Sequence, residues 1–259
     1  MESKDYQGLK NIEDIAIERL KFFEPPEGYY VAYSGGKDSD VILDLVHRSG
    51  VKYDAHHNLT TADPPEVVRH VKEQADVEIH RPKETMWELI KRKGFPPRRN
   101  IRYCCETQKE CGGTGRKVIT GIRWGESRNR TKRKMVEGCY KDPTKKYLNL
   151  IIDWTTTDVW AYIRKYDIKY CSLYDEGFKR VGCVLCPMSR DIEWQMKRWP
   201  KIARAWERAI KSTFKPEKDI FKNKEEYWQW WINRDAVITN ENGVPIKEVE
   251  QGQKSLLGE

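Results

Sequence analysis

The sequence predicts an α/β fold, with a twisted, mostly parallel sheet, helices on both faces, and a small helical C-terminal appendage. Three observations support this. A strand runs through a glycine-rich loop into an amphipathic helix at residues 29–48, β-rich and helical segments alternate up to residue 120, and aromatic helical segments follow residue 190. We therefore expect a sheet domain over residues 1–190 and a Trp-rich helical region over residues 191–259.

The expected elements follow one another along the chain. Apolar residues at helical spacing between positions 9 and 20 predict a helix that ends before Pro25. Strands are predicted at 29–33, 51–57, 77–80 and 117–120. Helices are predicted at 67–74 and 86–93, and a further helix is expected to follow a cap at Ser39 or Asp40 and to end near residue 48. Parallel sheets of this kind bind ligands at the carboxyl ends of their strands. We expect the C-terminal tryptophans to form a core rather than a base-stacking surface, and residues 240–259 to be a polar, frayed tail.

Residues 34–39, Ser-Gly-Gly-Lys-Asp-Ser, stand between the first strand and its helix. Unpaired backbone N–H groups and the positive end of the helix dipole meet there, which favours a phosphate-bearing ligand. A plain glycine turn would account for one glycine, but not for two glycines bracketed by serines. The adjacent glycines also differ from the G-x-x-x-x-G-K-[ST] loop. Gly35 and Gly36 allow the backbone to approach an oxyanion closely, and Lys37 adds a positive charge. Ser34 and Ser39 add hydroxyl donors.

Composition restricts the class of protein. The chain has 259 residues, a net charge of +8 and a pI near 9.0, which favours nucleotides and leaves tRNA or DNA open as partners. No apolar run approaches the ~20 residues of a membrane span, and no signal-peptide h-region follows the N-terminus. We expect a cytoplasmic protein without membrane association, whose seven cysteines serve metal, cluster or catalysis rather than disulfides.

Two cysteine pairs stand far apart in the sequence. Cys104 and Cys105 are adjacent, while Cys183 and Cys186 form a C-x-x-C knuckle between Gly182 and Pro187. Together they supply the four ligands that tetrahedral zinc or a four-iron cluster needs. Adjacent cysteines suit separate iron corners better than one zinc ion, so a [4Fe-4S] cluster is favoured over zinc. Buried free thiols remain the alternative.

These segments resemble the phosphoadenylyl-sulfate (PAPS) reductase family of the PP-loop, adenine nucleotide α-hydrolase-like superfamily, whose adenylyl-sulfate (APS) reductases hold a [4Fe-4S] cluster on such cysteine pairs. Residues 60–66, 119–127 and 153–163 match family landmarks in order, and the resemblance covers roughly residues 25 to 190. It implies ATP, APS or PAPS as the substrate nucleotide. The nucleotide-binding residues it implies are Tyr33, Ser34, Gly35, Gly36, Lys37, Asp38, Ser39, Thr60, Asp63, Gly121, Arg123, Glu126 and Ser127.

One departure from the family changes the expected chemistry. Sulfonucleotide reductases of the family use a thiol in a late Glu-Cys-Gly segment, and residues 187–259 contain no cysteine. We therefore expect an ATP-dependent reaction that releases pyrophosphate and transfers sulfur to an acceptor such as nucleic acid. Mg²⁺ would bridge the phosphates with help from Asp38, and Lys37, Arg123 and Arg128 would stabilise phosphoryl charge.

Other readings stay open. Reduction of APS or PAPS would need an unusual nucleophile such as Cys111 or Cys139, together with a thiol reductant. Sulfur transfer would need a donor such as a cysteine desulfurase. A nucleotide and cluster sensor without turnover is a third reading, and a homodimer is compatible with the sequence. Basic residues within 116–134 could follow a nucleic-acid backbone or could simply be solvated. The five histidines show no metal spacing and receive no role.

Overall fold

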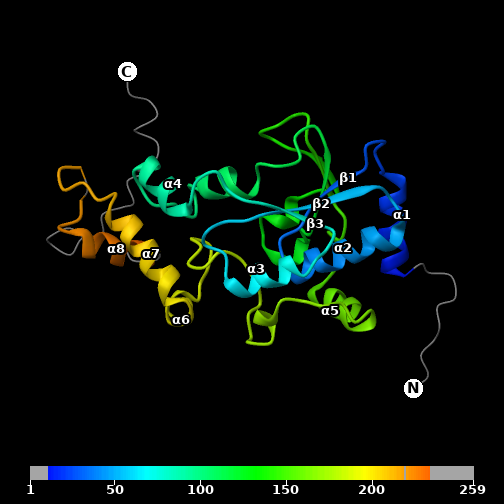
Figure 1. Cartoon of the computed structure of the whole chain (residues 1–259). Helices are drawn as coiled ribbons and strands as arrows, with labels where there is room; N and C mark the ends of the chain where they lie inside the picture. The colour runs from blue at the N-terminus through cyan, green and yellow to red at the C-terminus, as the bar shows by residue number, and fades with distance from the viewer. Residues whose placement is uncertain (1–10, 219, 234–259) are drawn as a thin grey trace. The chain divides into compact units, whose positions relative to one another are not determined.

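The computed structural model describes residues 11–218 and 220–233, so the expected tail at 240–259 lies outside the described residues (Figure 1). These residues pack as two compact units. The first comprises residues 11–59, 63–81 and 111–182, and the second comprises residues 60–62, 82–110, 183–218 and 220–233. The units do not follow the boundary expected at residue 190, because the connection after the third strand packs with the C-terminal helices.

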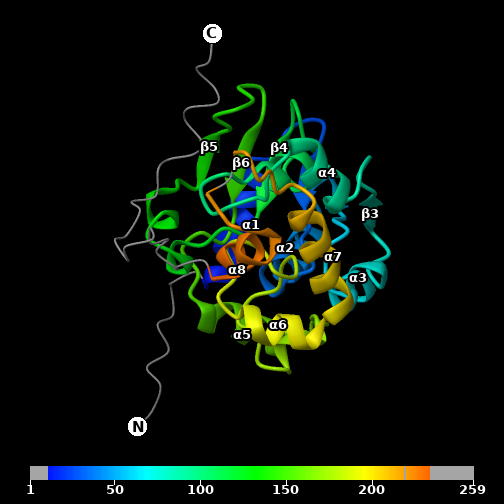
Figure 2. The ribbon, with the colours of Figure 1, turned by 90° about the vertical axis from the view of Figure 1, so that its left-hand side faces the viewer.

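The first unit is built on a six-stranded sheet in the order β3-β2-β1-β4-β6-β5. The strands are β1 (Tyr29–Ala32), β2 (Tyr53–Asn58), β3 (Val77–His80), β4 (Lys117–Thr120), β5 (Val136–Gly138) and β6 (Lys146–Asn149). All neighbouring strands are parallel except β5 and β6, which are antiparallel. Strands β5 and β6 lie side by side in Figure 2. The predicted α/β class and mostly parallel sheet are confirmed.

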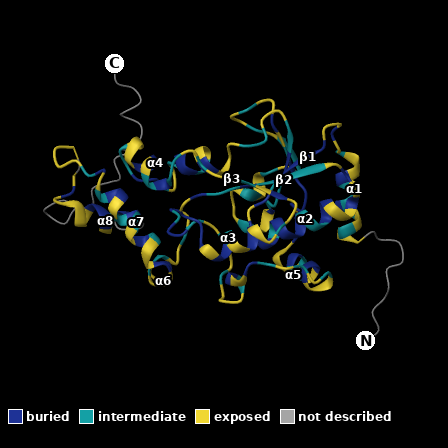
Figure 3. Cartoon of the chain, viewed as in Figure 1, coloured by how far each residue is buried: buried dark blue, intermediate teal, exposed yellow. Residues whose placement is uncertain are grey.

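The described part of this unit has four α-helices: α1 (Ile12–Phe22), α2 (Lys37–Ser49), α3 (Pro65–Lys72) and α5 (Thr156–Lys165). Helix α2 packs against both α1 and α5, and its apolar residues Val41, Ile42, Leu45 and Val46 are buried, in keeping with the dark blue along the helix (Figure 3). The helix ends at Gly50, whose φ of 72° is the left-handed conformation that favours glycine. Tyr29 of β1 donates a hydrogen bond to the Leu20 carbonyl of α1, so this face of β1 is turned toward the helices.

The opposite face of the sheet carries Tyr30, which pairs with Asp54 of β2 and Val118 of β4. Two loop glycines lie against it: a Cβ at Gly112 would stand 2.1 Å from the Tyr30 hydroxyl, and one at Gly113 would stand 2.5 Å from Val118. Alternate residues of a strand point to opposite faces, so polar residues of β2 and β3 share the Tyr30 face.

The second unit is helical. It contains α4 (Met86–Lys93), a short π-helix (Cys105–Lys109), α6 (Ile192–Arg198), α7 (Pro200–Lys211) and α8 (Lys224–Ile232). Helix α4 packs on α7, and α7 packs on α6 and α8. Trp206 and Trp231 are buried and donate to the carbonyls of Val184 and Pro97 at 2.9 and 2.8 Å. These tryptophans therefore form a core, as expected. Among the described helices, none combines the length and apolar character that a membrane crossing demands.

Candidate functional site

The loop at residues 34–39 connects the carboxyl end of β1 to the first turn of α2. Gly35 has a φ of 71°, and a Cβ there would lie 2.8 Å from Val71 of α3, so the position requires glycine twice over. Gly36 is the N-cap of α2, and its N–H donates to the Ser39 hydroxyl at 3.1 Å. The N–H of Lys37 donates to the Tyr174 hydroxyl, also at 3.1 Å. Two backbone N–H groups of the loop thus donate to side-chain hydroxyl groups, whose place a ligand oxygen could take.

A charged array stands beside this loop. The Asp38 carboxylate accepts from Lys37 Nζ at 3.0 Å and from Arg123 Nε at 2.6 Å. The Lys37 and Arg123 side chains are only 4 and 3% exposed. Arg123 Nη1 also donates to the Trp154 carbonyl, and its backbone N–H donates to the Glu126 carboxylate. Gly121 allows this approach, because a Cβ there would lie 3.1 Å from the Cβ of Asp38. The predicted residues Lys37, Asp38, Arg123, Glu126 and Gly121 therefore come together.

A second layer of positive charge surrounds Glu126. Arg130 forms an ion pair with Glu126, and Arg180 approaches the same carboxylate at 4.0 Å. Burial, together with repulsion from Arg180 and Arg133, lowers the pKa of Arg130 to about 10. A cationic group whose neighbours disfavour its charge would gain from a bound anion. The sequence prediction missed Arg180, since nothing local in the sequence places it beside residues 123–130.

Tyr33 points into the core rather than into the loop. Its hydroxyl donates to the Asp40 carboxylate at 2.5 Å, and His70 Nε2 lies 2.9 Å from the same oxygen. Burial raises the pKa of Asp40, although the contacts with His70 and Tyr33 oppose the shift. The group ties the end of β1 to α2 and α3. Tyr33 therefore stands in a position that supports the loop.

The remaining nucleotide-binding candidates are placed as follows. Asp63 is buried just before α3, whereas Ser34, Ser127 and Arg128 are exposed. Thr60 belongs to the second unit, where its hydroxyl lies 3.5 Å from the Cys183 sulfur.

The two predicted cysteine pairs meet in the second unit. Cys104, Cys105, Cys183 and Cys186 line one pocket, with Met86, Pro187 and Trp206 among its apolar walls. All four are free thiols. Arg102 donates to the Cys105 sulfur at 3.2 Å, and hydrogen bonds from Cys104 and Arg102 lower the pKa of Cys105. The pocket therefore presents four cysteine sulfurs to one metal ion or cluster, and the Cys105 thiol loses its proton more easily than an ordinary cysteine.

The C-x-x-C knuckle is held by groups that the sequence did not suggest. Leu185 adopts a φ of 55° and is completely buried. Its N–H donates to Gln195 Oε1 at 2.7 Å, and the N–H of Cys186 donates to the Cys183 carbonyl at 3.2 Å. A left-handed leucine is uncommon and is retained where the surroundings hold it. Gln195 of α6 therefore positions the second cysteine pair.

A family model described as the phosphoadenosine phosphosulfate reductase domain matches residues 28–189, more than half of the chain. The chain belongs to this family. The recognition made from the loop and the cysteine pairs is thereby confirmed.

Relatives in this family include named reductases. Adenosine 5'-phosphosulfate reductase of Staphylococcus haemolyticus is 26% identical over 206 residues, covering 71% of this chain and 82% of its own length. The uncharacterized protein MJ0066 of Methanocaldococcus jannaschii is 31% identical over 226 residues, covering 79% of this chain and 44% of its own length. The chain spans about half the length of MJ0066 and of a second M. jannaschii relative, MJ0973 (44% and 51%).

A solved structure supports the fold. The phosphoadenylyl-sulfate reductase of Candida auris, determined as a phosphate complex, matches with a TM-score of 0.52 and 21% identity. The match covers 67% of this chain and 88% of that one. At this identity the likeness concerns the fold alone.

Proposed function

We propose that the chain is an enzyme that binds an adenine nucleotide with its phosphates at residues 34–39. The observation that carries this proposal is the buried array of Lys37, Asp38 and Arg123 at the N-terminus of α2. Two buried cations beside a glycine-rich helix start suit a phosphoanhydride, because a charged ligand oxygen could replace the hydroxyl and carboxylate partners that they have now. The phosphate in the Candida auris relative's structure is in keeping with this.

Asp38 suits a role with Mg²⁺. Its carboxylate is held between Lys37 and Arg123 and is partly exposed. A carboxylate and phosphate oxygens are the usual ligands of Mg²⁺ in nucleotide sites. A nucleotide arriving with Mg²⁺ would engage Asp38 through the metal and free Lys37 and Arg123 for phosphoryl oxygens.

The reaction we favour is ATP-dependent sulfur transfer. An acceptor oxygen attacks the α-phosphorus of ATP, the bond to the bridging oxygen breaks, and pyrophosphate leaves. A thiol reductant supplies two electrons to release sulfide from the persulfide of a donor such as a cysteine desulfurase, and that sulfide displaces AMP from the activated acceptor, forming a carbon–sulfur or phosphorus–sulfur bond. Lys37 and Arg123 would stabilise the charge that grows on phosphoryl oxygens. Exposed Arg128, Lys132 and Lys134 offer free positive charge to a nucleic-acid acceptor.

We propose that the cysteine pocket holds a [4Fe-4S] cluster. Four cysteines line the pocket, and four is the number of ligands that such a cluster needs. The adjacent Cys104 and Cys105 suit separate iron corners better than a single tetrahedral zinc ion. Cys104, Cys105, Cys183 and Cys186 would hold the cluster. When bound, it would supply sulfur-handling or redox chemistry.

Sulfonucleotide reduction is the second candidate, favoured by the relatives named adenosine 5'-phosphosulfate reductase. It needs a thiolate in the nucleotide-binding unit. Cys171 is fully buried, and burial raises its pKa. Burial also acts on Cys139, but hydrogen bonds from Tyr147 and from backbone N–H groups outweigh it and lower the pKa. Cys139 is therefore the better nucleophile candidate, while Cys111 is exposed.

One experiment separates these candidates. The anaerobically purified chain is incubated in parallel with ATP plus tRNA or DNA and a sulfur donor, and with APS or PAPS plus a thiol reductant. Acceptor-dependent release of pyrophosphate supports sulfur transfer. Sulfite release supports reduction, and its loss in Cys139→Ser would name the nucleophile. Tight nucleotide binding without either product would instead support a sensor and contradict both enzymatic proposals.

A further inference from the structure

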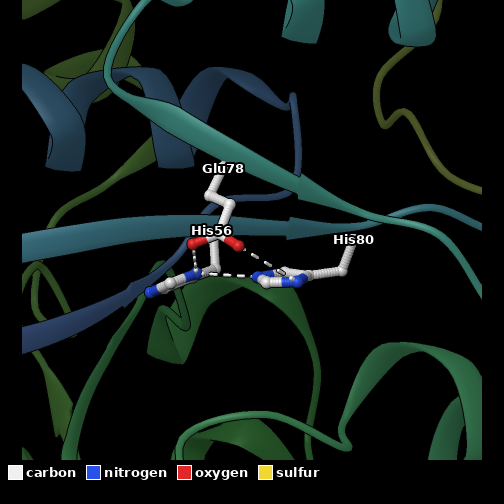
Figure 4. A group of neighbouring side chains, drawn as sticks. All are labelled: His56, Glu78 and His80. Carbon is white, nitrogen blue, oxygen red and sulfur yellow. Dashed lines mark hydrogen bonds and ion pairs between the residues drawn. The ribbon is translucent and has the colours of Figure 1, made fainter.

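Three side chains that the sequence left without a role converge on the Tyr30 face of the sheet. Figure 4 shows His56, Glu78 and His80 pointing toward one another from β2 and β3. His56 Nδ1 lies 2.8 Å from His80 Nε2 and 3.5 Å from Glu78 Oε2. Glu78 Oε1 lies 3.7 Å from His80 Nδ1. One ligand atom from each residue falls within 4.8 Å of the other two.

Strand register creates this cluster. His56 pairs directly with Glu78 in the parallel ladder, and Asn58 pairs with His80. Residues two apart on a strand share a face, so Glu78 and His80 point to the same side as His56. His56 lies more than twenty positions before Glu78 and His80 in the sequence, and the pairing of β2 with β3 brings it beside them. For this reason the cluster does not appear as a metal-binding spacing in the sequence.

The surroundings orient His56 as a ligand. Its Nε2 contacts the Asp54 carboxylate, which Arg116 Nη2 holds in turn at 2.5 Å. With Nε2–H donating to a carboxylate, Nδ1 keeps its lone pair for the cluster, an arrangement common behind metal-bound histidines. The Tyr30 ring stacks on His56 with centroids 4.2 Å apart, which fixes the imidazole plane.

We infer that His56, Glu78 and His80 form a binding site for a transition-metal dication, with Zn²⁺ as the best match. Two imidazoles and one carboxylate are an open zinc ligand set that leaves a fourth position for water. Tetrahedral zinc with Zn–N bonds of about 2.0–2.1 Å would place the two nitrogens roughly 3.3 Å apart. The present 2.8 Å would open by a few tenths of an ångström. His80 can make that shift, because it ends the edge strand β3 and its side chain is 39% exposed.

Solvent reaches this cluster. An open hollow of about 600 Å³ is lined by Asp54, His56, Glu78 and neighbouring residues. The Glu78 side chain is 66% exposed, so the site can load without opening the fold. A bound ion would tie the edge strand β3 to β2. The donors are nitrogen and oxygen, which distinguishes this site chemically from the four cysteines.

The test reads the histidines directly, because zinc bound by cysteines would confuse a stoichiometry. The full chain is labelled with ¹⁵N-histidine and titrated with Zn²⁺ at neutral pH. The ring nitrogens of His56 and His80 are expected to shift together, while His57 and His70, which are buried, stay in place. His47 is exposed at the end of α2 and lines the same hollow, so it serves as the control for Zn²⁺ that binds the hollow without using His56, Glu78 and His80.

Variants complete the test. Glu78→Gln and His80→Ala alter partly exposed residues and should fold normally. Asp54 supports a ligand without binding the metal, so we expect Asp54→Asn to weaken Zn²⁺ binding at the histidines about 10–100-fold. Glu78→Gln and His80→Ala each remove a ligand and should weaken it by at least as much. His47→Ala should leave it unchanged. If Zn²⁺ leaves His56 and His80 unshifted, or shifts them no more than His47, the pair is only hydrogen-bonded and the inference is overturned. Unchanged affinity in Glu78→Gln would equally overturn it.

Discussion

Gly35→Ala is the sharpest structural test of the loop. Gly35 has a φ of 71°, and a Cβ would stand 2.8 Å from Val71 Cγ2 and 3.0 Å from Val67 Cγ1. The left-handed conformation costs an alanine about 1–2 kcal/mol. Overpacking against the two valines adds about 1–3 kcal/mol. We therefore expect the free energy of unfolding to fall by roughly 2–5 kcal/mol.

Gly50→Ala is the matched control at the other end of α2. Its φ is 72°, nearly the same as that of Gly35, but nothing lies within 4 Å of its Cβ position. This variant should lose only the conformational part, about 1–2 kcal/mol. The steric part then predicts a Tm roughly 2–12 °C lower for Gly35→Ala than for Gly50→Ala, at about 2–4 °C per kcal/mol.

Denaturant unfolding, thermal melts and nucleotide titration are the assays. Gly35→Ala should also weaken nucleotide binding, whereas Gly50→Ala should not. Adding Val71→Ala to Gly35→Ala removes a colliding methyl, so the double variant should be less destabilised than the sum of the single ones. Equal stability of Gly35→Ala and Gly50→Ala would refute the close packing of the loop on α3.

Two further predictions concern the cysteine pocket and acid stability. Cys105→Ser should sharply lower the iron and sulfide content of the anaerobically purified protein and its absorbance near 400 nm. Substitution of the buried Cys171 by Ser should leave all three unchanged. Equal iron content in the two variants would argue against the cluster. The hydrogen bond from Arg19 lowers the pKa of Asp153, so this pair stabilises the fold above the ordinary carboxyl pKa of about 4 and loses that contribution as the pH falls below it. Denaturant unfolding should therefore show Asp153→Asn destabilised at pH 6 and the difference shrinking toward pH 3, and a pH-independent difference would contradict the assignment.

Much of the sheet could be predicted because its signals are local. The segments at 29–33, 51–57, 77–80 and 117–120 are rich in β-branched and aromatic residues, and β1 to β4 lie there. Strands β5 and β6 were missed, since β5 is only three residues, Val-Glu-Gly, and β6, Lys-Tyr-Leu-Asn, contains no β-branched residue. Helix α4 was predicted at its observed bounds, but its packing on α7 depends on tertiary contacts that periodicity does not reveal.

The candidate site likewise contains residues that local motifs predicted and residues that only tertiary contacts bring into place. The loop at 34–39 and the cysteine pairs were found because each is a short motif with chemistry of its own. Arg180 was missed because it approaches Glu126, which is distant in the sequence. Gln195 was missed because it acts on the cysteine knuckle through one hydrogen bond, from the N–H of Leu185. Thr60 was expected at the nucleotide, and its hydroxyl lies 3.5 Å from the Cys183 sulfur within the second unit, a contact that the sequence did not suggest.

The most direct measurement of the central claim is a binding titration of the anaerobic chain with ATP–Mg²⁺, APS and PAPS. It is repeated with Lys37→Ala and with Lys52→Ala, an exposed lysine, as control. Loss of a charge-assisted contact of about 1.5–3 kcal/mol predicts roughly 10–100-fold weaker binding of the preferred nucleotide to Lys37→Ala, and wild-type affinity for Lys52→Ala. Wild-type affinity in Lys37→Ala, or no binding of any of the three nucleotides to the unaltered chain, would contradict a phosphate site at the start of α2.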